Sequence, residues 1–291
     1  MKKTYLFAGI SIFFWSTIAT VSKLLLTAMN SYQMLAYSTF FAFLAFFILN
    51  LFTGNFKTLK TYRFKDYVIL VLIGLPGTFL YYVFYYSGTK IMLASQAFIV
   101  NYLWPIMSVL FACLLLKQTL TVRKIIAIAV SFLGVFTVAG GDLIHFNLTT
   151  LLGALFCVLG AISYGSFTAL NQKFCYDKRI ATMFFFLVSF LLSTAINVFS
   201  KTTVSVTAPQ LLGLAYNGIF VMATASATWA IALESGKTAT ISNLAYITPF
   251  LSLIWTSLFL KEPITLWSIL GLCIIIFGIF IQLNDKKEAT L

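Results

Sequence analysis

The chain has 291 residues, of which 61% are hydrophobic and only 9% are charged, whereas roughly a quarter of the residues of an average soluble protein are charged. This composition excludes an ordinary soluble protein and indicates a polytopic membrane protein. The net charge of +12 does not indicate nucleic-acid binding, because the basic residues lie in loops beside apolar segments.

Apolar segments of about 20 residues recur along the chain and predict an all-α membrane protein with ten transmembrane helices. The predicted helices cover residues 5–26, 31–52, 66–87, 91–116, 121–140, 150–173, 180–200, 209–233, 238–260 and 265–283. The first helix follows two lysines, as in a signal peptide. It is too long for one and lacks a small-residue cleavage site, so we interpret it as a membrane span.

The fourth predicted helix contains the string Asn101-Tyr102-Leu103-Trp104-Pro105 near its middle. Proline removes a backbone donor and clashes with the preceding turn, so Pro105 predicts a break in this helix. Within lipid, such a break is tolerated only against protein or a water-filled cavity. The string therefore marks a candidate site.

The ninth predicted helix repeats this pattern 144 residues later, with Tyr246, Thr248 and a second predicted break at Pro249. Aligning residues 102–136 with 246–280 without a gap gives 10 identities in 35 positions, more than shared hydrophobicity explains. We therefore predict two five-helix repeats, residues 1–146 and 147–291, each with one broken helix around a central cavity.

Positive charge predicts the orientation of the chain. If the N-terminus is cytoplasmic, fifteen Lys and Arg residues face the cytoplasm, and only Lys23, Lys90, Lys201 and Lys261 face the other side. Both termini are therefore predicted to be cytoplasmic. Because each repeat has an odd number of spans, the repeats are inverted. Such repeats are typical of secondary transporters, although duplication also occurs in channels.

The candidate substrate-binding residues lie around the two predicted breaks and on the helices beside them. They are Asn101, Tyr102, Trp104, Tyr246, Thr248, Ser252, Tyr82 in the third helix and Tyr164 in the sixth. Aromatic side chains also pack helices and form interfacial belts, but belts lie at the ends of spans and these residues lie near the middle.

Charge is sparse inside the predicted spans and shows no obvious proton relay, so we expect movement down the substrate gradient, with proton exchange as the alternative. Glu234 and Lys90, matched by the 144-residue offset, are possible gate or coupling charges, although solvated residues at helix ends are the simpler explanation. Lys23 is expected to extend its ammonium group to the membrane surface.

Enzyme chemistry has little support in this sequence. His145 is the only histidine, and no Cys-x-x-Cys pair occurs, so neither a metal site nor another cofactor is predicted. An intramembrane enzyme acting on lipids would need a nucleophile with a base, or a set of metal ligands, and the spans offer neither.

The predicted site would accept an amphiphilic solute. A substrate ammonium group can rest on the face of Trp104 or Tyr102 by cation–π attraction. A substrate carboxylate can meet the N-terminus of a half-helix. Both features suit a hydrophobic or aromatic amino acid, although a lipophilic cation such as a quaternary-amine drug would also fit.

The two break motifs, the Lys117-Gln118 pair after the fourth helix and the whole-chain arrangement resemble the ten-helix, EamA-type branch of the drug/metabolite transporter superfamily. Around the breaks, the chain is most similar to bacterial exporters of aromatic amino acids. The resemblance implies that Tyr102, Trp104 and Ser252 line the cavity. A tryptophan typical of these exporters falls on Tyr164 here, which puts the substrate range in doubt.

We therefore expect a transporter that exports aromatic or other large neutral amino acids by alternating access. It is expected to be a monomer in the bacterial inner membrane, with a multidrug or quaternary-amine exporter as the alternative.

Overall fold

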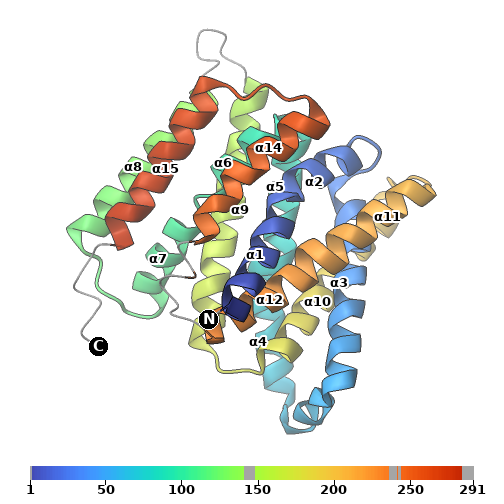
Figure 1. The fold of residues 1–291 in the computed structure, drawn as a ribbon. Coiled ribbons are helices and arrows are strands. Elements are labelled where there is room, and N and C mark those ends of the chain that lie inside the picture. Colours follow the sequence, from blue (N-terminus) through green and yellow to red (C-terminus); the bar gives the residue numbers. More distant parts are fainter. Residues whose placement is uncertain (1, 141–147, 236–240, 242–243, 284–291) are drawn as a thin grey trace.

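The computed structural model describes residues 2–140, 148–235, 241 and 244–283, and every regular element among them is a helix (Figure 1). The elements up to residue 140 are α1 (Lys2–Ser16), α2 (Ile18–Leu26), α3 (Ser31–Thr53), η1 (Asn55–Thr61), α4 (Phe64–Gly74), η2 (Leu75–Leu80), α5 (Tyr81–Ile91), α6 (Ala94–Asn101), α7 (Trp104–Leu115) and α8 (Val122–Gly140). The later elements are α9 (Leu148–Lys173), α10 (Lys178–Ser200), α11 (Ala208–Tyr216), η4 (Asn217–Thr224), α12 (Ala225–Ser235), η5 (Ala245–Ile247), α14 (Thr248–Leu260) and α15 (Leu266–Leu283).

The described helices agree with the ten predicted spans and confirm an all-helical membrane protein. Seven helical stretches within the described ranges are long and apolar enough to cross a membrane, and Ala245–Leu260 and Leu266–Gln282 are shorter apolar helices. With α8, these make ten. Most of the expected ends lie within about three residues of the observed ones, which is normal for helix boundaries. The start of the predicted ninth span, at residue 238, lies outside the described residues.

Two spans contain a widened, π-helical turn at matching places. Residues Leu75–Leu80 form one between α4 and α5, and Asn217–Thr224 form the other between α11 and α12. Pro76 explains the first, because proline cannot donate the hydrogen bond that continues an α-helix. Such turns are often found at functional sites. In the sequence, Gly74, Pro76 and Gly77 mark the first of these turns, whereas no proline marks the second.

The two halves of the chain pack through each other rather than side by side. Helix α3 packs on α10, α1 on α12, and both α5 and α7 on α9. Helix α8 pairs along its length with α15, and this pair forms one flank of the bundle (Figure 1). Small residues permit this close approach. A Cβ atom at Gly134 of α8 would lie 2.8 Å from the backbone oxygen of Gly271 in α15.

The backbone turns that end α7 and α14 are alike. Lys117 and Lys261 follow these helices, are separated by the 144-residue offset, and have left-handed φ angles of 59° and 57°. The division of the chain at residues 146 and 147 stays a prediction, because residues 141–147 lie outside the described part.

Candidate functional site

The first helix break lies between α6 and α7. Helix α6 ends at Asn101, and Pro105 is the second residue of α7. Between them the chain tightens, because the N–H of Leu103 bonds the oxygen of Val100 at 3.2 Å. Pro105 is tolerated there, since the first N–H groups of a helix have no partner within it. Tyr102 and Trp104 lie in this turn, and their rings meet edge to face at 6.3 Å.

The second break has the same construction. The short element η5 turns tightly before Thr248, and Pro249 is the second residue of α14. Residues 236–240 and 242–243, which lead to this break, are outside the described part of the chain. Thr248 and Ser252 lie one turn apart on α14 and are both buried.

The two breaks are in direct contact through Tyr102. Its hydroxyl donates a hydrogen bond to the backbone oxygen of Ala245, and its ring meets that of Tyr246 edge to face at 6.4 Å. Tyr102 is only 4% exposed. The structure therefore brings Tyr102 and Tyr246 together, and it uses the Tyr102 hydroxyl to connect one broken helix to the other.

An aromatic wall, formed by Tyr81, Tyr82, Trp104 and Tyr164, lies beside the first break. Tyr164 of α9 contacts Trp104 edge to face with ring centres 5.2 Å apart, and Tyr81 at 4.8 Å. Tyr82 lies against Tyr81 at 4.7 Å. Helices α5, α7 and α9 thus bring together three of the predicted residues, and Tyr81 joins them.

Buried amide and hydroxyl oxygens at the two helix breaks have free hydrogen-bonding capacity among the described residues. The Asn101 side-chain nitrogen donates to the Tyr81 hydroxyl at 3.1 Å, which leaves its oxygen buried without a partner among the described residues. The Ser252 hydroxyl is also buried and has no hydrogen-bond partner among the described residues. By contrast, Ser108, at the matching position of α7, donates to the oxygen of Trp104 at 2.8 Å. Buried polar atoms normally find partners, so Asn101 and Ser252 are suited to bind a solute or water.

Asn217, at the start of the widened turn η4, is a buried polar residue that the sequence analysis missed. Its side-chain nitrogen donates to the hydroxyl oxygens of Ser38 at 3.0 Å and Tyr86 at 2.9 Å. It thereby joins three spans. An amide in the middle of an apolar segment was the available signal.

The possible gate charges lie apart from the aromatic wall. Glu234 and Lys90 are exposed near the ends of α12 and α5 and form no hydrogen bond or ion pair with each other. Lys23, which was expected to extend its ammonium group to the membrane surface, has this group bound by backbone oxygens. It is half-buried and donates to the backbone oxygens of Thr89 and Met92. Glu262, which the sequence analysis passed over, is buried.

No group of three or more His, Cys, Asp or Glu residues within the described ranges is arranged to hold a metal ion.

A family profile and several known proteins match the sequence of this chain. The profile of the EamA-like transporter family matches residues 2–140 and 151–283. An uncharacterized transporter, YvbV of Bacillus subtilis, is 24% identical over 238 residues, 78% of this chain and 75% of its own length. The aromatic amino acid exporter YddG of Salmonella typhimurium is 24% identical over 230 residues, 74% of this chain and 72% of its own. YddG of Ancylobacter novellus is 24% identical over 62% of this chain and 63% of its own.

A crystal structure of a protein 20% identical covers 100% of both chains with a TM-score of 0.70, which supports the fold. The family profile covers most of the chain in two successive matches, and the helical bundle agrees with it. The chain is therefore a multi-pass membrane transporter and belongs to the EamA-like transporter family.

Proposed function

We propose that the protein exports amino acids with aromatic or other large neutral side chains. The observation that carries this proposal is the aromatic wall of Tyr81, Tyr82, Trp104 and Tyr164 beside a helix break with unpaired buried oxygens. The wall provides an apolar surface for a substrate side chain, and the break provides polar groups for its charged end. The names of the YddG relatives support the same class of substrate.

The polar end of the substrate has two different partners in this proposal. The Asn101 oxygen accepts from the substrate ammonium group, which also lies against the electron-rich face of Trp104. The carboxylate lies at the N-terminus of α7 or α14, where the helix dipole favours an anion. No membrane-embedded cation is needed, and a phosphorylated substrate would lack the arginine or lysine that usually binds it.

Transport proceeds by alternating access in this proposal, with Tyr246, Thr248 and Ser252 on the second-half side of the site. The two halves, 1–146 and 147–291, are inverted, and one rocks against the other around the broken helices. The excess of Lys and Arg on one side supports cytoplasmic termini in a bacterial inner membrane. The protein acts as a monomer and moves its substrate down the concentration gradient.

A multidrug or quaternary-amine exporter is the second candidate, because aromatic faces also bind large cations. The test follows labelled tryptophan, phenylalanine, threonine and methyl viologen across sealed liposomes that contain the purified protein, with and without a pH gradient. Saturable movement of the aromatic amino acids, unchanged by the gradient, is the expected result. Movement of methyl viologen alone would refute amino-acid export, and gradient-dependent movement would refute the facilitator mechanism.

A further inference from the structure

Glu262 fastens one broken helix to the other at the far end of α6. It lies between α14 and α15 and is 8% exposed, which is rare for a carboxylate. Its two oxygens accept the backbone N–H groups of Ala94 at 2.7 Å and Ser95 at 2.9 Å, and one also accepts the Ser95 hydroxyl at 2.7 Å. These are the first residues of α6. A carboxylate there gains charge-assisted hydrogen bonds and the favourable field of the helix dipole.

Lys23 of α2 fastens the adjacent end of α5. Its ammonium group donates to the backbone oxygens of Thr89 at 2.8 Å and Met92 at 2.6 Å, at the C-terminal end of α5, where a cation is favoured. Helices α5 and α6 are joined only by Met92 and Leu93. Lys23 and Glu262 thus place opposite charges at the two helix ends that meet in this turn, on Met92 and Ala94. Two opposite charges therefore bind the end of α5 and the start of α6, which meet at the turn of one helical hairpin.

This hairpin carries much of the proposed site. Helix α5 begins with Tyr81 and Tyr82, and α6 ends with Asn101. Helices α2 and α14 contact each other and both contact α6. A separation of α6 from α14 would break the hydrogen bonds from Ala94 and Ser95 to Glu262.

We propose that Glu262 and Lys23 form the gate at this end of the bundle, and that the charge of Glu262 sets how often the gate opens. This inference rests on the proposed alternating-access transport. Glu262 acts as a positioning residue in it, because it holds α6 rather than touching the substrate.

The chain offers an internal comparison at Gln118, which precedes Glu262 by 144 residues. The backbone N–H of Gln118 bonds the oxygen of Ala112 at 3.4 Å, and that of Glu262 bonds the oxygen of Thr256 at 3.4 Å. The same turn presents a buried carboxylate in one half and an exposed, neutral amide in the other. In an inverted arrangement Gln118 and Glu262 lie at opposite ends of the helical bundle. The end with the Glu262 carboxylate is therefore held closed more strongly than the end with Gln118.

The test measures how fast a cysteine behind the gate reacts with a water-soluble maleimide. Ser22, next to Lys23 and fully buried, is replaced by cysteine in a protein whose four native cysteines are alanine, reconstituted in lipid nanodiscs. Glu262→Gln is expected to raise the labelling rate about 5- to 30-fold, the range for loss of a partly buried charge from a helix terminus. Lys23→Gln, which leaves the carboxylate intact, is expected to raise it too.

Two controls separate a gate from general loosening. Lys201→Gln removes an exposed charge after α10 and is expected to leave labelling unchanged. Ser193→Cys, buried in α10, is expected to stay unreactive in every variant. The gate would be refuted if Glu262→Gln left the labelling rate of Ser22→Cys unchanged or lowered it. It would also be refuted if Glu262→Gln raised the labelling rate of Ser193→Cys by the same factor. Faster labelling in a protein that moves no amino acid would instead refute the substrate and leave the gate standing.

Discussion

Replacing Tyr102 with phenylalanine removes the hydrogen bond that joins the two helix breaks while keeping the ring. The bond is buried, and its acceptor is the Ala245 oxygen. That oxygen also accepts the N–H of Thr248, so it does not become an orphaned buried acceptor. The expected cost is therefore that of one ordinary hydrogen bond, about 0.5–1.5 kcal/mol, rather than the larger penalty of an unpaired group.

Thermal unfolding of the purified protein in detergent would measure this cost. At roughly 2–4 °C per kcal/mol for a chain of this size, Tyr102→Phe should lower the unfolding midpoint by about 1–6 °C. Midpoints must be compared at one heating rate, because membrane proteins often unfold irreversibly.

Tyr246→Phe is the matched control for Tyr102→Phe. Tyr246 occupies the equivalent place in the second half, packs on Tyr102 and on Phe280, and loses no hydrogen bond within the described residues when its hydroxyl is removed. Its midpoint should stay within about 1 °C of the wild type, as for a change that breaks no bond. An equal fall of the unfolding midpoint in both variants, or no fall in Tyr102→Phe, would refute a stabilising hydrogen bond from Tyr102 to Ala245.

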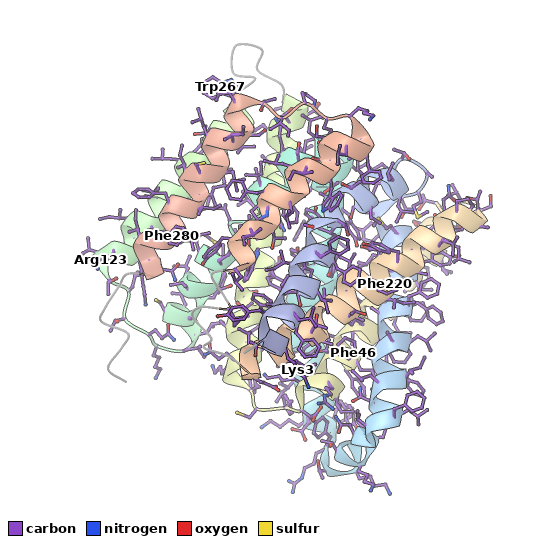
Figure 2. All side chains as sticks on the ribbon, in the orientation of Figure 1. Lys3, Phe46, Arg123, Phe220, Trp267 and Phe280 are labelled. Atoms are coloured by element: carbon purple, nitrogen blue, oxygen red, sulfur yellow. The ribbon has the colours of Figure 1, made fainter. Side chains whose placement is uncertain are left out.

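Three further results are expected. Trp104→Ala should lower saturable transport of aromatic amino acids at least tenfold without loss of expression, whereas Trp267→Ala, half-exposed at one end of α15 (Figure 2), should transport normally in the same liposome assay. Gly134→Ala should cost about 1–3 kcal/mol by overpacking α8 against α15, because its Cβ would meet backbone at 2.8 Å, whereas Gly9→Ala, with open space around it, should not lower the unfolding midpoint. Tyr164→Trp should raise the uptake of tryptophan relative to threonine in competition assays, and an unchanged ratio would remove this residue from substrate selection.

Local chemistry explains why the sequence predicted so much of the scaffold. Apolar segments about 20 residues long have few alternatives to a membrane helix, because the lipid offers no partner for backbone groups. Pro105 and Pro249 act on the backbone within one turn, so their effect needs no knowledge of neighbours. The internal repeat also identified Tyr102 and Tyr246 as equivalent residues from the sequence, before the structure showed that their rings are in contact.

Contacts between helices were harder to predict, because they depend on how each helix is rotated about its axis and how deep it lies in the membrane. Of the four tyrosines that begin α5, the sequence analysis selected Tyr82, yet Tyr81 is the one whose hydroxyl accepts a hydrogen bond from Asn101. The helical period separates these neighbours by about 100° but does not say which faces α9. The widened turn at Asn217 was also missed, since no proline marks it and a π-helical turn needs only a local change in hydrogen bonding.

Charge was sought in the middle of the spans, because a buried charge in lipid is costly and therefore functional. The same cost can be met at a helix end, where backbone groups provide a partner without a second charged side chain. Glu262 uses this solution, with three donors from two residues of α6. Its sequence position gave no sign of burial, because a segment between two helices normally lies in water. The contrast with Gln118 could be interpreted only once the structure showed that one member of the pair is buried and the other exposed. Inverted repeats make the two ends of a transporter alike, so a difference of one charge between equivalent positions is a simple physical means of favouring closure at one end.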